Sequence, residues 1–369
     1  MKKNLFQYAS VTAMLSCIAC FPGTSQTATG KTLKEAYKAD FVIGAALNAQ
    51  QIEEKDPKAA VLIPQQFNAI TPENDMKAEN IHPEWARYNF DLADKLVAYG
   101  NKHNMQVNGH TLVWHSQLPP FARKINDVDS FKTFFTNHIT TLATRYNGKV
   151  YSWDVVNEAL NEDGTMRKSI FLEKLGPDFV TEAFRLTQKA SPNTVLVYND
   201  YNNEQPKKRA GCIELIKKIQ AAGVRIDGVG IQGHWHLGRV PFKDIEESIL
   251  AYHALGLKVM ITELDIEMLP RTYQGADVNQ RMASNPALNP YAQGIPDSLL
   301  QQQAKDYERL FQLFLKHKDK VTRVTFWGVN DAQSWLNGWP VPGRTNYPLL
   351  FDRAFNPKPA YNAVIALKK

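Results

Sequence analysis

The chain contains the stretches Trp153-Asp-Val-Val-Asn-Glu158 and Val259-Met-Ile-Thr-Glu263, two apolar runs that each end in a glutamate. Both runs are rich in β-branched residues and have the length of a buried strand, so each glutamate follows a strand directly. When parallel strands close into a barrel, their carboxyl ends meet at the mouth, where active sites form. These stretches therefore predict a pair of carboxylates at one end of a parallel barrel.

Short apolar runs alternate with amphipathic helical patterns along the whole chain. Strands and helices in this alternation form a parallel sheet, and eight repeats predict a single (β/α)8 TIM barrel of the α/β class. An open doubly wound sheet is the competing architecture, but no glycine-rich phosphate turn follows the first run. The expected strands are residues 41–45, 67–71, 105–113, 150–157, 195–199, 228–232, 258–262 and 324–328. The expected helices are residues 90–104, 131–146, 177–190, 207–222, 245–255 and 298–316.

Glycines and one long polar segment mark the connections between these elements. Gly100, Gly223 and Gly256 stand where a helix is expected to stop in a left-handed conformation. Residues 269–296, after the seventh expected strand, are rich in Pro, Gly, Asn and Gln. A connection of this length is typical of a functional loop, here over the barrel mouth, and it carries no clear calcium-ligand pattern.

Composition and charge are those of an ordinary globular protein. The chain has 369 residues, of which 44% are hydrophobic and 22% charged, and its net charge is +6. The positive charges are scattered rather than clustered with aromatic residues, which argues against nucleic-acid binding. No low-complexity linker or repeat follows residue 32, so residues 33–369 are expected to form one barrel domain and the protein to be a monomer.

The N-terminus is typical of an export signal, expected at residues 1–20 and followed by a short flexible spacer, residues 21–32. Two lysines precede an apolar stretch that is too short for a stable membrane span. Small residues before Cys17 and Cys20 resemble a lipoprotein cleavage site, so an ordinary signal peptide and a lipid anchor to the membrane both remain open. Either alternative predicts an exported protein that is periplasmic or anchored at the cell envelope, or otherwise secreted.

The two strand-end glutamates point to glycosidic hydrolysis. An unpaired buried carboxylate is costly, so its position at a strand end is better explained by function than by packing. In a retaining glycosidase one carboxyl group acts as acid and then as base, while the other attacks the sugar carbon. The first must stay protonated near neutral pH and the second ionised. We therefore predict a retaining glycoside hydrolase using Glu158 and Glu263, with Asn157 bound to the sugar 2-hydroxyl.

His110 lies within the third expected strand, and His234 and His236 follow the sixth. His-X-His at strand spacing also occurs in zinc sites, but no third ligand arrives at a suitable spacing, so we predict no metal and no cofactor. We instead expect His234 to be a neutral hydrogen-bond partner of Glu263. Asp265 would orient His234, because it lies two residues after Glu263 and on the same side of the strand.

Aromatic and basic residues complete the expected cleft. Trp114, Trp327 and Trp335 lie in polar loop contexts. Sugars present flat C–H faces that stack on aromatic rings and leave their hydroxyls at the rim. The three tryptophans are therefore expected to form the cleft walls, and His110 and Lys77 to donate hydrogen bonds to sugar hydroxyls.

At these residues the chain resembles a glycoside hydrolase family 10 endo-β-1,4-xylanase, and the resemblance covers residues 33–367. The matching stretches are Thr71-Pro-Glu-Asn-Asp-Met-Lys-Ala-Glu, Gly109-His-Thr-Leu-Val-Trp-His-Ser-Gln-Leu-Pro, Trp153-Asp-Val-Val-Asn-Glu-Ala, Gly230-Ile-Gln-Gly-His-Trp, Ile261-Thr-Glu-Leu-Asp-Ile and Asn337-Gly-Trp-Pro. The resemblance implies a (β/α)8 barrel in which Glu158 is the acid/base and Glu263 the nucleophile.

The resemblance also implies the remaining roles in the cleft. Glu73 and Asn74 would bind the next sugar towards the non-reducing end, and Tyr201 would form a platform on the leaving side. A cis peptide would join His110 and Thr111, which is rare for a non-proline bond. Around the sugar at the cleaved bond it places Lys77, His110, Trp114, Asn157, Gln232, His234, Trp327 and Trp335.

The chain also departs from the family pattern. It lacks the cysteines for the disulfide that many relatives carry near the end of the barrel, and it has no linked polysaccharide-binding module. Together with the possible lipid anchor, and by analogy with the family, this favours soluble xylan fragments or decorated xylo-oligosaccharides handled at the cell envelope over crystalline wall material. Three alternatives stay open: a related barrel glycosidase acting on β-1,4-glucan or mannan, a non-catalytic carbohydrate-binding barrel, and a metal-dependent hydrolase.

Overall fold

The computed structural model describes residues 31–271 and 276–368. The chain divides after Gly30, and the part from Lys31 onward forms one unit that contains every described element. The expected signal peptide and most of the expected spacer lie outside the described residues. No helix within the described ranges is both long and apolar enough to cross a membrane.

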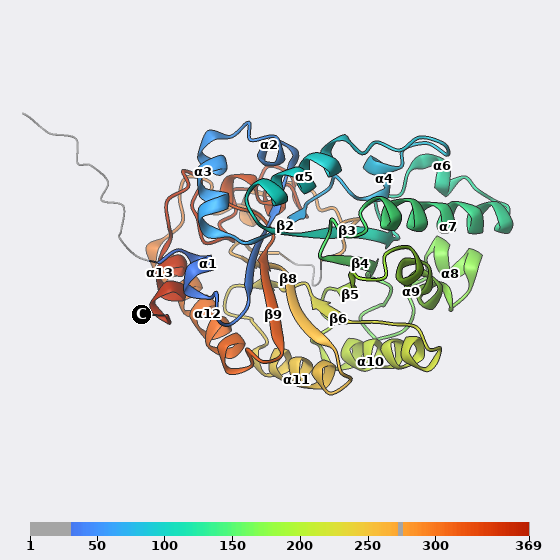
Figure 1. The fold of residues 1–369 in the computed structure, drawn as a ribbon. Helices are drawn as coiled ribbons and strands as arrows, with labels where there is room; N and C mark the ends of the chain where they lie inside the picture. The colour runs from blue at the N-terminus through green and yellow to red at the C-terminus, as the bar shows by residue number, and fades with distance from the viewer. Residues whose placement is uncertain (1–30, 272–275, 369) are drawn as a thin grey trace, which may run out of the picture. The chain divides into compact units, whose positions relative to one another are not determined.

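Eight parallel strands close into a barrel at the centre of this unit, with helices around it (Figure 1). Strands next to each other in the ring pair in parallel, and β1 closes the ring by pairing with β9. All eight expected strands are present, so the prediction of a (β/α)8 barrel is confirmed. The barrel strands are β1 (Val42–Leu47), β2 (Ala69–Pro72), β3 (Gln106–Trp114), β4 (Ser152–Asn157), β5 (Val195–Asp200), β6 (Gly228–Ile231), β8 (Lys258–Glu267) and β9 (Val321–Phe326).

A short additional strand, β7 (His234–His236), was not expected from the sequence. It pairs in parallel with the last residues of β8, which runs on to Glu267, beyond the expected end of this strand. This pairing puts His234 directly opposite Asp265. The extra strand therefore positions a predicted site residue beside its predicted partner.

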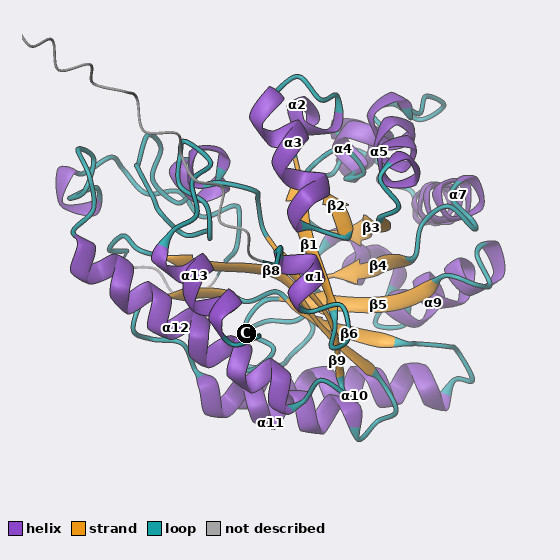
Figure 2. Cartoon of the chain, turned by 60° about the vertical axis from the view of Figure 1, so that its left-hand side comes forward, coloured by secondary structure: helices purple, strands orange, loops and turns teal. Residues whose placement is uncertain are grey.

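The six expected helices are present and cover the outside of the barrel (Figure 2). They are α5 (Asp91–Lys102), α7 (Val128–Arg145), α9 (Phe179–Ala190), α10 (Pro206–Ala221), α11 (Phe242–His253) and α12 (Asp297–Lys316). Helix α3 (Pro57–Gln66), which lies between β1 and β2, was not predicted from the sequence. Its start is clear locally, because the Asp56 carboxylate caps two backbone N–H groups and Pro57 occupies the first helical position.

Shorter helices and turns fill the connections between the main elements. They are α1 (Leu33–Ala36), α2 (Ala49–Ile52), α4 (Ala78–Ile81), α6 (Pro120–Arg123), α8 (Ile170–Leu175) and α13 (Pro359–Ala366), with three short 3₁₀ turns at Pro286–Leu288, Asp331–Gln333 and Trp335–Asn337. The barrel strands are buried almost throughout, including every residue of β4. Helices cover the outer face of each strand, which is why the strands appear in the sequence as continuous apolar runs.

The prediction that a helix ends at a glycine is wrong at one of the three positions, Gly100. Gly223 and Gly256 adopt φ angles of 68° and 80°, as predicted. Helix α5 instead continues past Gly100, and Asn104 takes the left-handed conformation with φ 53°. Gly100 is needed for close packing, because a Cβ atom there would lie 2.3 Å from Cγ2 of Val107 on β3.

Register shifts interrupt three strand pairs near their carboxyl ends. They fall between His110 and Val113 on β3, between Asp154 and Val156 on β4, and between Ile261 and Leu264 on β8. Such irregularities redirect side chains next to active sites. The implied cis peptide between His110 and Thr111 is present at the first of these shifts.

Candidate active site

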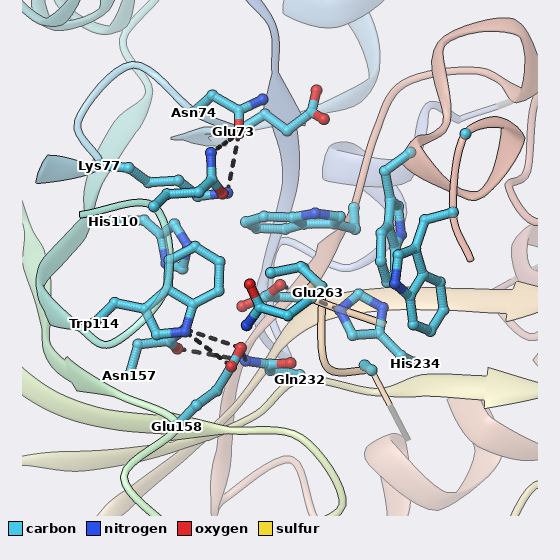
Figure 3. Close-up of a pocket in the computed structure, with 18 of the residues that line it drawn as sticks. Glu73, Asn74, Lys77, His110, Trp114, Asn157, Glu158, Gln232, His234 and Glu263 are labelled. Carbon is cyan, nitrogen blue, oxygen red and sulfur yellow. Dashed lines mark hydrogen bonds and ion pairs between the residues drawn. The ribbon is translucent and has the colours of Figure 1, made fainter. Parts of the chain in front are cut away.

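A cleft of about 370 Å³ opens at the carboxyl ends of the barrel strands. Twelve of the fourteen predicted site residues line it, and Asp265 and Tyr201 are the two that do not. In Figure 3, Glu73 and Asn74 lie at one end of the view, Glu158 at the other, and Glu263 between them. The predicted residues that line the cleft are Glu73, Asn74, Lys77, His110, Trp114, Asn157, Glu158, Gln232, His234, Glu263, Trp327 and Trp335.

Glu158 is a buried carboxyl group with hydrogen-bond donors on both oxygens. Trp114 Nε1 donates to Oε2 at 2.8 Å, while Gln232 Nε2 and Asn157 Nδ2 donate to Oε1 at 3.1 and 3.0 Å. Burial raises the pKa of Glu158, the donors from Gln232 and Trp114 oppose that rise, and the nearby charge of Glu263 adds to it. The net effect favours the protonated form.

Glu263, at the same end of the barrel, has the opposite shift. Asn199 Nδ2 donates to its Oε1 at 2.7 Å, and His234 Nε2 lies 3.2 Å from its Oε2. Burial alone would raise the pKa of Glu263, but the hydrogen bond from His234, the electrostatic effects of His110 and His234, and the hydrogen bond from Asn199 together outweigh burial and lower the pKa. Two buried carboxyl groups in one cleft are thus driven towards different protonation states.

A chain of side-chain amides connects the two carboxyl groups. Asn199 Nδ2 donates to Asn157 Oδ1 at 2.9 Å as well as to Glu263. Asn157 in turn donates to Glu158. Asn199 was not singled out from the sequence, although it stands in β5 at the strand end where the other predicted polar residues were found.

The surroundings of His234 raise its pKa and so favour the charged ring, in place of the neutral ring predicted from the sequence. Its Nδ1 lies 3.0 Å from Asp265 Oδ1, so both ring nitrogens face a carboxylate. Burial opposes the charge, but Asp265 and Glu263 outweigh it and raise the pKa of His234 to about 10. The sequence predicted both neighbours correctly. The protonation state follows from having both at hydrogen-bonding distance, which only the packing of β7 against β8 establishes.

Polar side chains crowd the end of the cleft formed by β2 and β3. Lys77 Nζ donates to Asn74 Oδ1 and Gln117 Oε1, both at 3.0 Å, and lies 4.8 Å from the centre of the Trp114 ring. Burial lowers the pKa of Lys77 and raises that of Glu73. Buried donors and acceptors that face a cleft suit a ligand rich in hydroxyl groups.

Three tryptophans line the cleft as predicted. Trp335 Nε1 donates to Asp265 Oδ2 at 2.8 Å, and its ring stacks on Trp339 with a centroid distance of 4.5 Å. Trp327 packs edge-on against His110 at 5.2 Å. Trp327 and Trp335 also pack against His234, with centroid distances of 6.4 and 5.0 Å, so neighbouring rings hold these two walls in place. Trp339, which also lines the cleft, was not selected from the sequence.

The profile of glycosyl hydrolase family 10 matches residues 32–367. The chain belongs to glycosyl hydrolase family 10. It is 42% identical over 343 residues to endo-1,4-beta-xylanase A of Xylanibacter ruminicola, covering 91% of this chain and 93% of that protein. It is 40% identical over 336 residues to a beta-1,4-xylanase of Dictyoglomus thermophilum, covering 90% of each.

Solved structures agree with this membership. A family 10 endoxylanase from a sugarcane soil metagenome superimposes with a TM-score of 0.87 at 41% identity, covering 92% of this chain and 100% of that chain. A xylanase of Thermotoga petrophila solved with xylobiose has a TM-score of 0.80 at 33% identity, covering 91% of this chain and 97% of that one. The predicted family and the prediction of a glycoside hydrolase are confirmed.

Tyr201 is not placed as a sugar platform in this family 10 enzyme, which corrects the role implied by resemblance. It is 3% exposed, and Lys208 Nζ lies 3.8 Å from the centre of its ring. Its hydroxyl accepts a hydrogen bond from Arg167 Nη2 at 2.8 Å. A ring buried in this way has no open face on which a sugar could stack.

The three histidines do not converge on a common point as metal ligands would. His110 Nδ1 lies 2.9 Å from Asp154 Oδ2, and His234 lies between its two carboxylates. His236 Nε2 lies 2.9 Å from the carbonyl oxygen of Leu269. Each ring therefore has a protein partner of its own within the described residues.

The long loop after β8 reaches the cleft, which confirms its predicted place over the barrel mouth. Ala276, Val278, Asn279 and Arg281 line the cleft. Asn279 Nδ2 donates to Ser116 Oγ at 2.8 Å, which joins the loop to the segment after β3. The loop therefore adds walls that the strand-end motifs alone did not predict.

Proposed function

We propose that this family 10 enzyme is a retaining endo-β-1,4-xylanase that hydrolyses internal β-1,4-xylosidic bonds of xylan or xylo-oligosaccharides. The observation that carries the mechanism is the opposite pKa shift of two buried carboxyl groups in one cleft, upward for Glu158 and downward for Glu263. The names of the most similar relatives, which are xylanases, support the substrate.

In the first step the ionised Glu263 attacks the anomeric carbon of the xylose ring. The bond from that carbon to the leaving oxygen breaks as Glu158 gives its proton to the oxygen, and a glycosyl ester forms on Glu263. The donors from Asn199 and His234 hold the attacking carboxylate in place and keep it ionised.

In the second step water attacks the anomeric carbon of the ester. Glu158, now ionised, removes a proton from the water, and the Glu263 carboxylate leaves. Two inversions restore the β configuration. Each glutamate returns to its starting protonation state, which is the state that its surroundings favour.

The other cleft residues would bind the sugars. We assign Glu73 and Asn74 to the next sugar towards the non-reducing end. We assign Asn157, beside the acid/base, to the 2-hydroxyl group, where a hydrogen bond strengthens in the transition state. Around the sugar at the cleaved bond we place Lys77, His110, Trp114, Gln232, His234, Trp327 and Trp335.

Replacement of each glutamate tests the mechanism. Glu263→Ala should abolish hydrolysis of aryl β-xylobioside while xylotriose still binds, and undiminished turnover would contradict its role. Glu158→Ala should turn over a 2,4-dinitrophenyl substrate faster when azide is added, because azide attacks the glycosyl ester without a base and yields β-xylosyl azide.

Stereochemistry gives an independent test of the retaining course. Proton NMR during the first minutes of xylotriose hydrolysis should show the β anomer as the first product. Formation of the α anomer first would overturn the mechanism. A crystal structure should place the two carboxyl groups about 5–5.5 Å apart, the spacing of retaining enzymes.

We further propose that the enzyme is exported and acts on xylan fragments at the cell envelope. Similar kcat/KM values on xylotriose and on long xylan would support this preference, and a steep preference for insoluble xylan would contradict it. Cell fractionation and mass spectrometry of the mature N-terminus would separate a lipid anchor at Cys17 or Cys20 from an ordinary cleaved signal peptide.

A further inference from the structure

Glu158 has a backbone conformation that few residues other than glycine adopt. Its φ angle is 58°, in the left-handed region, although it carries a side chain. Such a conformation is unfavourable on its own and persists only where the surroundings hold it. Its backbone N–H donates to the carbonyl oxygen of Asn199 at 2.9 Å, which holds one side of the residue.

A single residue, Arg167, holds the carbonyl groups on the other side. Its Nε donates to the carbonyl oxygen of Glu158 at 3.0 Å, and its Nη2 donates to that of Leu160 at 3.2 Å. Its own backbone N–H donates to the carbonyl oxygen of Ala159 at 2.7 Å. Three consecutive carbonyl groups that begin at the acid/base are thus bound by one residue.

The guanidinium group of Arg167 is itself held from two directions. Nη2 donates to the Tyr201 hydroxyl at 2.8 Å, and Nη1 lies 3.6 Å from Oδ2 of Asp277 in the long loop after β8. Its planar shape allows these contacts at once, whereas a lysine ammonium could not reach all of them. Tyr201 therefore has a structural contact in place of the platform role expected from the sequence.

We infer that Arg167 is the positioning residue of the acid/base, and that its ion pair with Asp277 makes the placement of Glu158 depend on docking of the loop after β8. This inference deepens the proposed function and rests on it. Arg167 does not line the cleft that holds the two glutamates; with Asp277 it lines a neighbouring cavity that shares Asn279 with the cleft. Its contacts with Glu158 are to the backbone, so its proposed action on the acid/base is positional.

The positive charge of Arg167 has a second effect on Glu158, through its pKa. Its positive charge lowers the pKa of Glu158 and so opposes the larger upward effect of burial. The other charged or titratable groups that interact with Glu158 come from several elements: Glu263 on β8, Asp200 on β5, Tyr201 after β5 and Lys77 after β2. Arg167 contributes from the connection between β4 and α8.

Hydrolysis of two aryl β-xylobiosides with different leaving groups can show whether Arg167 positions the acid or only stabilises the fold. A phenyl substrate needs a proton on its leaving oxygen, whereas a 2,4-dinitrophenyl substrate leaves readily without one. Arg167→Met should lower kcat/KM on the phenyl substrate about 100-fold, within the usual range for a general acid, and leave the dinitrophenyl substrate within about threefold. The ratio of the kcat/KM values on the two substrates does not depend on the fraction of the protein that is folded.

Arg167→Lys separates geometry from charge. It should reproduce the loss on the phenyl substrate, because the ammonium cannot hold both carbonyl groups. It should leave the alkaline limb of the kcat/KM profile unmoved, whereas Arg167→Met should shift that limb to higher pH. Equal losses on both substrates, or a lysine variant with the wild-type ratio, would overturn the positioning role.

Asp277→Asn tests the link to the loop, and Lys168→Met is the matched control for Arg167→Met. Lys168 has the same charge as Arg167 and follows it in the chain, but it forms no ion pair within the described residues. Asp277→Asn should lower kcat/KM on the phenyl substrate at least about threefold with the dinitrophenyl value unchanged. A wild-type ratio in Asp277→Asn would overturn the coupling. A change in Lys168→Met equal to that in Arg167→Met would overturn the positioning role of Arg167.

Wild-type activity separates this inference from the proposed function. If the wild-type enzyme hydrolyses neither aryl xylobioside, the proposed function fails before any variant is compared. If the wild type hydrolyses both and the variants keep its ratio, the proposed function stands and the role of Arg167 is wrong.

Discussion

The Nδ1 atom of His234 lies 3.0 Å from Oδ1 of Asp265, on the side of the ring opposite to Glu263. Burial would keep this ring neutral, but the Asp265 carboxylate overcomes burial and holds the positive charge in place. The charged ring then lowers the pKa of Glu263. The ionisation of the proposed nucleophile therefore depends on a residue that does not line the cleft.

Asp265→Asn should shift the acidic limb of the pH profile. Loss of the carboxylate lowers the pKa of His234, so a smaller fraction of His234 is protonated. The positive charge that stabilises ionised Glu263 is then weaker, and the pKa of Glu263 rises. Because Glu263 must be ionised to attack, the acidic limb of kcat/KM should move to higher pH by about one unit. An unmoved acidic limb would show that His234 is charged without Asp265.

Trp114→Phe should shift the other limb of the profile. The indole N–H stabilises the ionised form of Glu158, so its removal raises the pKa of this glutamate. Glu158 must be protonated in the first step, and the alkaline limb of kcat/KM should therefore move up by about half a unit to one unit. Trp85→Phe, at a tryptophan that is 48% exposed, serves as the control and should leave both limbs unchanged.

Stability should fall at alkaline pH because of His234. Its pKa is about 10 in the folded protein and 6.5 in the unfolded chain, so its contribution is complete below pH 6.5 and is lost as pH rises towards 10. Urea unfolding between pH 6 and pH 10 should show a loss that is roughly 2–4 kcal/mol larger for the wild type than for His234→Gln. Equal losses in the two proteins would contradict the raised pKa.

Gly211→Ala should destabilise the protein through the connection that carries Arg167. A Cβ atom at Gly211 of α10 would lie 2.1 Å from the carbonyl oxygen of Gly164. The clash can be relieved only if α10 moves away from the connection between β4 and α8, which contains both Gly164 and Arg167. We expect a loss of about 2 kcal/mol or more in the free energy of unfolding. Gly223→Ala is the control: its Cβ meets no atom within 4 Å, and it should lose only about 1 kcal/mol, from its left-handed φ of 68°.

Trp335→Ala should relax the choice between xylose and glucose. Xylose lacks the C6 hydroxymethyl group, and a rigid wall at that position excludes glucose by steric clash. Stacking on Trp339 and the hydrogen bond to Asp265 hold Trp335 in place. The variant should raise the ratio of aryl cellobioside to aryl xylobioside hydrolysis about tenfold or more, within the range for one group in a pocket. A high ratio in the wild type would instead favour a β-1,4-glucan substrate.

The strand pattern and the strand-end residues were predictable for one physical reason. Parallel barrel strands are buried on both faces, so they appear as apolar runs, and their carboxyl ends all meet at one mouth. Glu158 and Glu263 are more than 100 residues apart in the chain, yet their positions at strand ends were enough to place them in one cleft. The same reasoning would have found Asn199.

The errors concern contacts that depend on more than one element. Gly100 looked like a helix stop because its role in packing against Val107 of β3 has no local signal. Tyr201 was expected to be open because its motif matches the family. Its burial depends on Lys208 of α10, which pairs with Asp200 at the end of β5 and lies over the Tyr201 ring.

The sequence by itself determined the barrel, the family and the two carboxyl groups that face each other across its mouth, because periodicity and strand-end position are encoded locally. Only the tertiary structure decided which groups carry a proton and which hold the backbone of the acid/base. Those properties depend on short distances between residues far apart in the chain, such as 3.0 Å between His234 and Asp265 and 3.6 Å between Arg167 and Asp277. Burial then decides how strongly each such contact acts.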